Sequence, residues 1–444
     1  MDFVSFLKKI NHTVPYPVGA LIQSTRPERL GKVGQVYRYA LSQIQQNNIK
    51  ELSLFAEEYL EKVEKILSFA KNNVQFYHLY PPTILDRISL REGLLELPIV
   101  NKRKLQNVVL LDRTSSRQGR FLANTGGSSG TPLEFYVNSD SVGHELAHIH
   151  HIWSTVGFTP GDLTLSFGGS HQKESPILYD WARHRYTVDT YHGWKTISES
   201  VRNIFRTKPI KFLHGFPSAI FDFVRWCADR DPATLAVLRK NVSGLLLGSE
   251  YPNPANRSEV EELLDCSSVS WYGHTERCIL AYERTNKGVY HPFYSYGFPE
   301  AVKIEGNYHL VGTSYYNFCS PFIRYDTEDL IFPELESGFL KSFTISDGRI
   351  GEYVYDKKGN KIFLTALIFG RHHPLFKSVR FLQVGQPKWG DVDIFLVPRE
   401  KANLSAAEAE RQFNGDGVNI EFRFVIVETP FITVRGKVPL LVPN

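Results

Sequence analysis

Hydrophobic and polar positions along the chain follow two periods, which predict a helical beginning and then alternating strands and helices. From about residue 35 to residue 77, apolar residues such as Leu60, Val63 and Leu67 recur at helical spacing, which predicts a helical N-terminal layer. After it, EFYVNSD is predicted to be a strand and SVGHELAHIHHIWSTVGF a helix. The pattern is typical of an α/β protein.

The middle of the chain contains strand-like runs that end in small and polar residues. IKFLHGFPSAIFDFVRWCADR predicts a strand and then a helix, and SGLLLGSE and SSVSWYGHTE are apolar runs of the same kind. Ligand-binding groups in α/β sheets collect where such strands end. We therefore expect Gly248, Ser249 and Glu250, together with residues 272–276, to border one cleft.

Past residue 350 the pattern predicts a smaller α+β unit. EYVYDKKGNKIFL is predicted to be a hairpin, DVDIFLVP and NIEFRFVIV are predicted to be strands, and LSAAEAERQF is predicted to be a short helix. A chain of 444 residues is long enough for two or three domains. We place the boundary at SDGRIGEY and predict domains of residues 1–348 and 349–444.

Composition excludes several classes of protein. The chain has a net charge of only +4 and no long run of Lys or Arg, so it offers no electrostatic basis for binding nucleic acid or an anionic membrane. Its four cysteines are scattered without a C-x-x-C pair, which argues against a zinc ribbon or a disulfide framework. No secretory signal or run of about 18 apolar residues is present, so we expect a cytoplasmic protein with no membrane insertion.

NTGGSSGTPLEF, residues 124–135, predicts a loop that binds an anion. Glycines let consecutive backbone N–H groups point into one concavity, and Ser and Thr hydroxyls add donors. A Walker loop requires Lys and then Ser or Thr after its last glycine, but here Gly130 is followed by Thr131-Pro132-Leu133. The loop does not fit G-x-G-x-x-G either. On its own, such a cluster is more often a surface turn.

The order of several motifs changes that interpretation. TGGSSGTP, YGHTE at 272–276, RYDTEDL at 324–330, GRIGE at 348–352 and RGK at 435–437 together resemble the adenylate-forming ligase superfamily. The likeness is to its phenylacetate-CoA-ligase-like branch, which includes capsule-biosynthesis coenzyme-synthetase-type proteins. LPIVNK at 97–102, GFPSAI at 215–220 and VRFLQVGQ at 379–386 match this branch too.

The resemblance implies a fold and a reaction. The fold is a large multi-sheet N-terminal domain with a helical layer, followed by a small mobile C-terminal domain. In the reaction a substrate carboxylate attacks the α-phosphate of ATP, which gives an acyl-adenylate and pyrophosphate and requires Mg²⁺. The residues implied to hold the phosphates are Thr125, Gly126, Gly127, Ser128, Ser129, Gly130 and Thr131.

The resemblance also assigns roles within YGHTE and RYDTEDL. Tyr272 is implied to stack on adenine, Thr275 to approach the α-phosphate, and Glu276 to hold Mg²⁺, with Gly273 and His274 completing the nucleotide contacts. Asp329 is implied to accept hydrogen bonds from the ribose hydroxyls. Two departures from the pattern stand out. Glu328 replaces the usual glycine, and Leu133 lies where a lysine is often found; Arg324 is either a nucleotide contact or a salt-bridge partner.

The hinge and the catalytic cation are assigned to the C-terminal part. Gly348-Arg349 followed by Glu352 fits the family's hinge better than Gly370-Arg371, so we assign the hinge there and place Arg349 among the nucleotide contacts. Lys437 matches the lysine that bridges the carboxylate and the α-phosphate. A cation at that point offsets the repulsion between two approaching anions.

One motif lies outside this scheme. HELAH, with His144, His148 and then His151 at helical spacing, matches the letters of a zinc-peptidase motif. In the resembled family this helix borders the acyl pocket, so its histidines face either substrate or solvent.

The sequence leaves substrate and acceptor open. The substrate is expected to be a small carboxylic acid, and the acceptor is CoA, another thiol, an amine or a sugar hydroxyl. Alternatives are an adenylyltransferase whose product keeps AMP, a zinc peptidase, and a nucleotide-binding relative without turnover. A homodimer is one option for assembly, and the capsule branch favours cell-surface or secondary metabolism.

Overall fold

The chain divides into two structural units, each assembled from segments that are separate in the sequence. The protein is described by a computed structural model over residues 12–47, 52–80, 90–116, 119–125, 133–139, 141–168, 175–345, 353–364, 367–368, 371, 373–398, 402–431 and 439–442. Unit 1 comprises Met1–Thr125, Leu133–Asp162 and Ser268–Gly348. Unit 2 comprises Gly126–Pro132, Leu163–Ser267 and Arg349–Asn444.

Unit 1 is built on a mainly antiparallel sheet. Its strands are β9 (Ser267–Gly273), β10 (Leu280–Glu283), β11 (Tyr290–Pro292), β12 (Gly297–Ile304), β13 (Asn307–Ser314), β14 (Tyr325–Glu336) and β15 (Phe339–Ile345). They lie in the order β12-β13-β14-β15-β11-β10-β9. The short strand β1 (Val100–Asn101) pairs with β14 in parallel, so LPIVNK docks against RYDTEDL.

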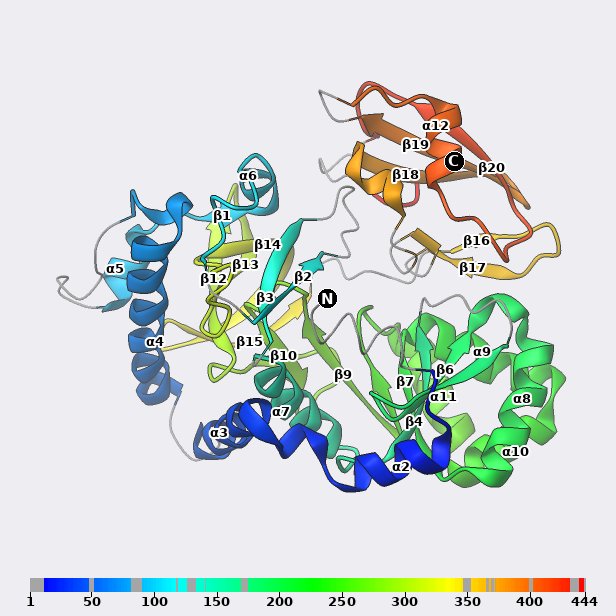
Figure 1. Ribbon diagram of the computed structural model, residues 1–444. Coiled ribbons are helices and arrows are strands. Elements are labelled where there is room, and N and C mark those ends of the chain that lie inside the picture. The colour runs from blue at the N-terminus through cyan, green and yellow to red at the C-terminus, as the bar shows by residue number, and fades with distance from the viewer. Residues whose placement is uncertain are drawn as a thin grey trace. The chain divides into compact units, whose positions relative to one another are not determined.

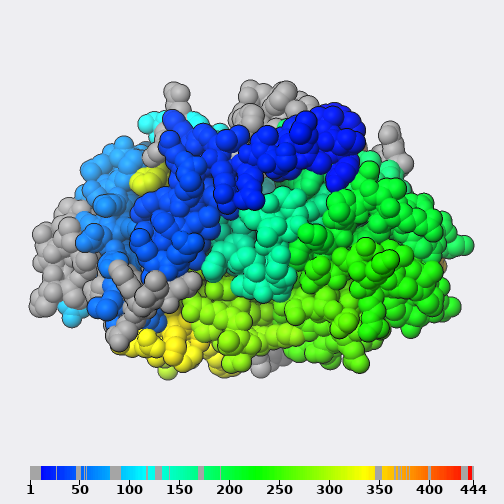
Figure 2. Space-filling model, turned by 90° about the horizontal axis from the view of Figure 1, so that it is seen from below, coloured from blue at the N-terminus to red at the C-terminus, as the bar shows by residue number. Residues whose placement is uncertain are grey.

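Helices cover this unit, as the N-terminal pattern predicts. They are α2 (Tyr16–Ser24), α3 (Gly31–Asn47), α4 (Leu52–Asn73), α5 (Leu90–Glu96), α6 (Lys102–Gln106) and α7 (Ser141–Ser154). Leu60, Val63 and Leu67, predicted core positions of α4, are fully buried. In Figure 1, α4 runs beside the sheet strands that it contacts, and in Figure 2 the dark-blue N-terminal helices lie at the surface.

Helix α7 packs closely on α3, and a glycine makes this approach possible. A Cβ atom on Gly143 would lie 2.1 Å from the carbonyl oxygen of Val33. Before α7 comes a two-stranded hairpin, β2 (Arg120–Asn124) and β3 (Glu134–Asn138), whose connection contains the glycine-rich loop. The predicted strand EFYVNSD and the predicted helix after it are therefore confirmed.

The first part of unit 2 is a mainly parallel sheet. Its strands are β4 (Leu163–Gly168), β5 (Ile177–Asp180), β6 (Arg185–Asp189), β7 (Ile210–Gly215) and β8 (Gly244–Leu247). Their order is β8-β7-β4-β6-β5, and only the edge strand β5 is antiparallel. The helices α8 (Trp194–Thr207), α9 (Pro217–Arg230), α10 (Pro232–Asn241) and α11 (Pro254–Leu264) flank it (Figure 1).

The C-terminal part has the predicted α+β elements and a core of its own. The hairpin is β16 (Tyr353–Tyr355) and β17 (Lys361–Phe363). It is followed by β18 (Val379–Lys388), β19 (Asp391–Pro398), α12 (Ala406–Gln412) and β20 (Glu421–Ile426). Val384, Ile394 and Leu396 are fully buried in this core. The boundary predicted at residues 348 and 349 lies outside the described residues and stays a prediction.

Two negative expectations can be compared with the described residues. Cys227, Cys266, Cys278 and Cys319 all lie within them, and none is in a disulfide. Among the helices described, none combines the length and the apolarity needed to cross a bilayer.

Candidate active site

Two predicted nucleotide contacts lie against each other in unit 1. The hydroxyl of Tyr272, at the end of β9, donates a hydrogen bond of 2.7 Å to Oδ2 of Asp329 on β14. Burial, and then the charge of Asp329, raise the pKa of the tyrosine hydroxyl, so it remains a donor. The bond fixes the orientation of the ring and leaves Oδ1 of Asp329 to accept from another donor.

Glu276 is held from both sides by a chain of hydrogen bonds. Its Oε1 accepts from the hydroxyl of Tyr325 at 2.7 Å, and its Oε2 lies 3.1 Å from Nδ1 of His274. The other ring nitrogen of His274 accepts the backbone N–H of Ile279 at 3.2 Å. Since Nε2 accepts, the proton lies on Nδ1 and is donated to Glu276, which fixes a neutral tautomer.

The surroundings of Glu276 keep its carboxylate ionised. The residue is 6% exposed, and burial alone works to raise its pKa. The hydrogen bonds from His274 and Tyr325 outweigh burial and lower the pKa of the carboxyl. Each oxygen has lone pairs left over, and a carboxylate oriented by such partners is the usual oxygen ligand of a divalent cation.

The donor set around Glu276 fits Mg²⁺ held by few protein ligands. No group of three or more His, Cys, Asp or Glu side chains able to hold a metal occurs among the residues that the structure describes. Mg²⁺ usually takes one or two carboxylates and fills its octahedron with water and phosphate oxygens. Glu276 can supply that carboxylate.

Arg324 has a structural partner for every side of its guanidinium. Its Nη2 lies 2.9 Å from a carboxylate oxygen of Glu300, and Nη1 donates to the carbonyls of Leu95 and Leu97 at 2.8 and 2.6 Å. It is 3% exposed. Of the two roles left open by the sequence, the structure therefore supports the salt bridge, here with Glu300, and the hydrogen bond to Leu97 ties LPIVNK to RYDTEDL.

Glu328 occupies the backbone conformation that glycine prefers. Its φ is +62°, in the left-handed region, where a side chain costs roughly 1–2 kcal/mol. Burial, and then the charge of Asp326, raise the pKa of its carboxyl, with Lys102 and Arg103 opposing. At this irregular point of β14 the backbone thus has the shape expected where the resembled family has glycine, and it carries the strain of a different residue.

Glu328→Gln is expected to stabilise the protein at pH 8 but not near pH 4. A carboxyl with a raised pKa binds its proton more tightly in the folded state, so stability falls as pH rises through the folded pKa. Glutamine carries no charge at any pH and so removes this loss of stability. We expect the free energy of unfolding at pH 8 to rise by on the order of 1 kcal/mol. Urea unfolding across this pH range measures it.

The matched control is Glu305→Gln. Glu305 also has a left-handed backbone, with φ of +48°, but its side chain is exposed at the β12–β13 turn. No pH-dependent gain is expected there. An equal gain in stability for both variants would show that replacing glutamate by glutamine in a left-handed conformation is itself stabilising, and that burial of the charge of Glu328 is not the cause.

Thr125 and Leu133, the residues on either side of the glycine-rich loop, are joined by two hydrogen bonds, and Leu133 lies where a lysine is often found. The N–H of Thr125 donates to the carbonyl of Leu133 at 3.0 Å, and the N–H of Leu133 donates to Oγ1 of Thr125 at 2.9 Å. Leu133 is fully buried. Its side chain therefore belongs to the core, and contact between the Thr125 hydroxyl and phosphate stays a prediction. Gly126, Gly127, Ser128, Ser129, Gly130 and Thr131 lie outside the described residues.

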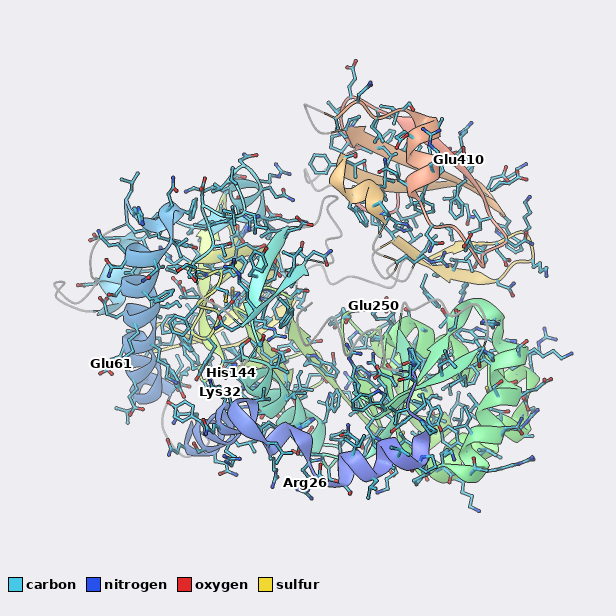
Figure 3. All side chains as sticks on the ribbon, in the orientation of Figure 1. Arg26, Lys32, Glu61, His144, Glu250 and Glu410 are labelled. Carbon is cyan, nitrogen blue, oxygen red and sulfur yellow. The ribbon has the colours of Figure 1, made fainter. Side chains whose placement is uncertain are left out.

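In unit 2, two predicted motifs meet at the carboxyl ends of β7 and β8. The N–H of Gly248 donates to the carbonyl of Gly215 at 3.1 Å. Glu250, labelled in Figure 3, is 6% exposed and accepts the N–H of Ser218, in the first turn of α9, at 3.1 Å. A carboxylate there stabilises the positive end of the helix. Contact between these residues and nucleotide stays a prediction.

Gly215→Ala is expected to destabilise the protein by about 3 kcal/mol, from left-handed strain plus overpacking. Gly215 has φ of +126°, and a Cβ atom would lie 2.1 Å from the carbonyl oxygen of Phe167. Gly168→Ala is the control, because a Cβ atom there meets nothing within 4 Å. Equal unfolding midpoints for the two variants would contradict the steric account.

Left-handed backbone gathers around the predicted motifs. Ser249, Arg277, Arg324 and Glu328 all have positive φ, and each lies within a motif or next to one. Strained conformations of this kind persist where the surrounding structure over-determines them, which is common at functional sites. The remaining non-glycine examples of the described chain, such as Glu305 and Ser337, lie largely in turns.

The two histidines of HELAH, His144 and His148, lie in the core and do not face substrate or solvent, whereas His151 is partly exposed. His148 is fully buried and has both ring nitrogens occupied, by the carbonyl of His144 at 2.9 Å and by Oγ of Ser295 at 2.8 Å. His144, labelled in Figure 3, pairs through Nε2 with the carbonyl of Ser295 at 3.1 Å. Burial lowers the pKa of both, that of His148 to about 3. Zinc binding by HELAH would require breaking these bonds.

In the C-terminal part, a buried glutamine binds the residues on either side of the undescribed stretch 432–438. Lys437 and Arg349 lie outside the described residues, so their roles stay predictions. Gln383, on β18, is 1% exposed and donates to the carbonyls of Phe431 and Pro439 at 2.9 and 2.8 Å. These two residues flank the stretch that contains Lys437. VRFLQVGQ, which the sequence identifies only through the family resemblance, therefore anchors the chain on both sides of residues 432–438 through Gln383.

Arg371, the rejected hinge candidate, bonds within the C-terminal part. Its Nη1 donates to the carbonyls of Asn414 and Asp416 at 2.9 and 2.7 Å. A residue that ties together loops of one domain is poorly placed to act as a hinge. The choice of Gly348-Arg349 stays a prediction.

Comparison with known proteins agrees with the motif order. No protein-family model matches the sequence. Protein CapK of Staphylococcus aureus is 21% identical over 427 residues, which cover 90% of this chain and 93% of CapK. The crystal structure of 2-hydroxyisobutyryl-CoA ligase with 2-HIB-AMP and CoA, in the thioesterification state, has a TM-score of 0.53 at 14% identity, covering 88% of this chain and 90% of that one.

A second structure of that ligase gives the same result. In the postadenylation state with R3-HIB-AMP, its TM-score is 0.52 at 13% identity, and it covers 88% of this chain and 90% of the ligase. At these identities the likeness concerns the fold. The α/β architecture and the resemblance predicted from the sequence are thereby confirmed: this chain has the fold of the adenylate-forming ligases.

Proposed function

We propose that this chain is an ATP- and Mg²⁺-dependent acid ligase. It joins a substrate carboxylate to the α-phosphate of ATP, releasing pyrophosphate, and then passes the acyl group to CoA or to another thiol, amine or hydroxyl. The observation that carries the proposal is the convergence in unit 1 of Tyr272, Glu276 and Asp329, each oriented by hydrogen bonds within the protein.

Each of these residues has a task suited to its surroundings. Asp329 keeps an oxygen that can accept from the ribose hydroxyls, and Tyr272, fixed by Asp329, offers a ring for the base. Thr275 is exposed at the turn, where its hydroxyl can donate to the α-phosphate. Glu276 would hold Mg²⁺, which supplies charge neutralisation for the phosphates. Lys437 would stabilise the charge that develops at the reacting oxygens.

The acceptor and the pathway form the finer part of the proposal. The ligase with the same fold was solved with CoA, which supports CoA as the acceptor. The likeness to CapK supports a role in making cell-surface polysaccharide. A cytoplasmic location accompanies this role.

Carboxylate-dependent exchange between ATP and labelled pyrophosphate, over a panel of acids, tests the proposal. At least one acid should support exchange that depends on Mg²⁺. Absence of exchange with every acid, in protein that binds ATP, would refute it and favour a binding protein without turnover. Mass spectrometry of the product separates a ligase, which releases AMP, from an adenylyltransferase, whose product keeps it.

A further inference from the structure

Helix α7 is docked on the segment before β12 by its histidines. His144 and His148 bond to the carbonyl and the hydroxyl of Ser295 at 3.1 and 2.8 Å. The ring of His144 also stacks on Tyr296, with centroids 4.9 Å apart. These contacts fix the rotation of the helix about its axis. They therefore determine where the residue between the histidines in the sequence, Glu145, presents its carboxylate.

Glu145 is shared between a tyrosine and an arginine. The hydroxyl of Tyr296 donates to its Oε2 in a short hydrogen bond. The same oxygen lies 3.8 Å from Nε of Arg277, whose Nη1 donates to Oγ of Ser141 at 3.2 Å. Ser141 is the first residue of α7. The guanidinium is thus held at two points of one helix turn.

Arg277 lies in the turn that presents Glu276. Its φ is +59°, and its N–H donates to the carbonyl of His274 at 3.1 Å. Left-handed backbone in a residue other than glycine is strained, and contacts with the surrounding structure, here those of Arg277 with α7, help to hold it. Shortly after Arg277 in the sequence, Ile279 closes the chain of bonds through His274 to Glu276.

We propose that Glu145 is a positioning residue for this turn: by fixing Arg277, it holds Thr275 and Glu276 in the arrangement that the adenylation reaction needs. The part concerning catalysis rests on the proposed function. HELAH then has one structural role, in which two histidines dock the helix and the glutamate between them acts through Arg277. The helix follows β3 directly, so it also connects the turn to the strand that leaves the glycine-rich loop.

Exchange kinetics of Glu145→Ala, Arg277→Ala and the double variant test the proposal. We expect each single variant to lower the turnover of ATP–pyrophosphate exchange about 10- to 100-fold, the usual effect of losing a residue that orients a metal ligand. Because both act through one contact, the double variant should be within about threefold of the slower single variant. If the fold-reductions of the two single variants instead multiplied in the double variant, the proposal would be overturned.

Two further variants guard against loss of folding and against general charge effects. Glu145→Gln keeps an acceptor for Tyr296, so it should fold and show an activity between those of the parent and of Glu145→Ala. Glu259→Ala removes the surface ion pair that Glu259 forms with Arg225 at 3.1 Å, and should leave exchange unchanged. An activity of Glu145→Gln equal to the parent's would show that the charge on residue 145 plays no part.

Hydrogen–deuterium exchange separates this proposal from the proposed function. In Glu145→Ala, the backbone amides of Arg277 and Ile279 should exchange at least about tenfold faster than in the parent, because their bonds to His274 open more often. Glu259→Ala should leave them unchanged. If the parent shows no enzymatic exchange with any acid, the ligase proposal fails, and these amides still decide whether Glu145 holds the turn. Unchanged amide exchange would overturn the positioning role.

Discussion

Glu276→Gln is expected to lower ATP–pyrophosphate exchange by a factor on the order of 10²–10³, and to raise the Mg²⁺ concentration that the reaction needs. The amide lacks the negative charge that a divalent cation prefers. A glutamine has only one acceptor oxygen, so its NH₂ group faces either the Nδ1 proton of His274 or the hydroxyl of Tyr325, and one of the two hydrogen bonds donated to residue 276 is lost. Turning the histidine to the other tautomer would break its bond to Ile279.

The measurement is the exchange rate as a function of Mg²⁺ at saturating ATP. Glu334→Gln is the control, because Glu334 is an exposed carboxylate of the same unit, paired with Lys341 at 3.1 Å. The control should behave as the parent protein. If Glu276→Gln retained the parent's rate and Mg²⁺ dependence, Glu276 would have no part in metal binding.

Lys437→Ala is expected to lower exchange by a similar factor of about 10²–10³ while changing ATP affinity by less than about threefold. An interaction that strengthens only as the two anions approach contributes to turnover rather than to ground-state binding. Exchange kinetics and calorimetric titration with ATP measure the two effects separately.

Two variants of the C-terminal part sharpen the interpretation. Lys388→Ala removes an exposed lysine of β18 and should have no effect on exchange. Gln383→Ala retains the lysine at position 437 but removes the hydrogen bonds to Phe431 and Pro439, which flank it in the sequence. Because the segment that carries the lysine loses this anchor, the rate of ATP–pyrophosphate exchange should fall. A normal rate in Lys437→Ala would exclude Lys437 from the chemistry.

Local pattern was enough to predict most elements. The helical spacing of Leu60, Val63 and Leu67 predicts α4, and the alternation in DVDIFLVP predicts β19, because burial of one face imposes these periods. The motif order gave the fold through resemblance. The set of residues brought together at the carboxyl ends of β7 and β8 also follows from the strand-end rule.

Long-range pairing and side-chain partners were beyond the sequence. The sequence of RYDTEDL does not show that Tyr325 donates a hydrogen bond to Glu276 or that Arg324 forms a salt bridge with Glu300. Both partners lie more than 20 residues earlier in the chain. Leu133 looked like a missing lysine, yet its burial places it in the core. Gln383 gave no signal either, since the sequence does not distinguish a buried amide from an exposed one, and only the structure shows its three hydrogen bonds to Phe431 and Pro439.

The hydrogen bonds around Glu276 have a calorimetric consequence. A ligand that must lose a proton makes metal binding depend on pH and on the ionisation heat of the buffer. Here the carboxylate is already ionised, and the protons that it accepts belong to His274 and Tyr325, which keep them. A cation arriving at Glu276 displaces no proton, so its binding heat should be the same at neutral pH in two buffers that bind Mg²⁺ weakly and differ in ionisation heat, such as PIPES and Tris.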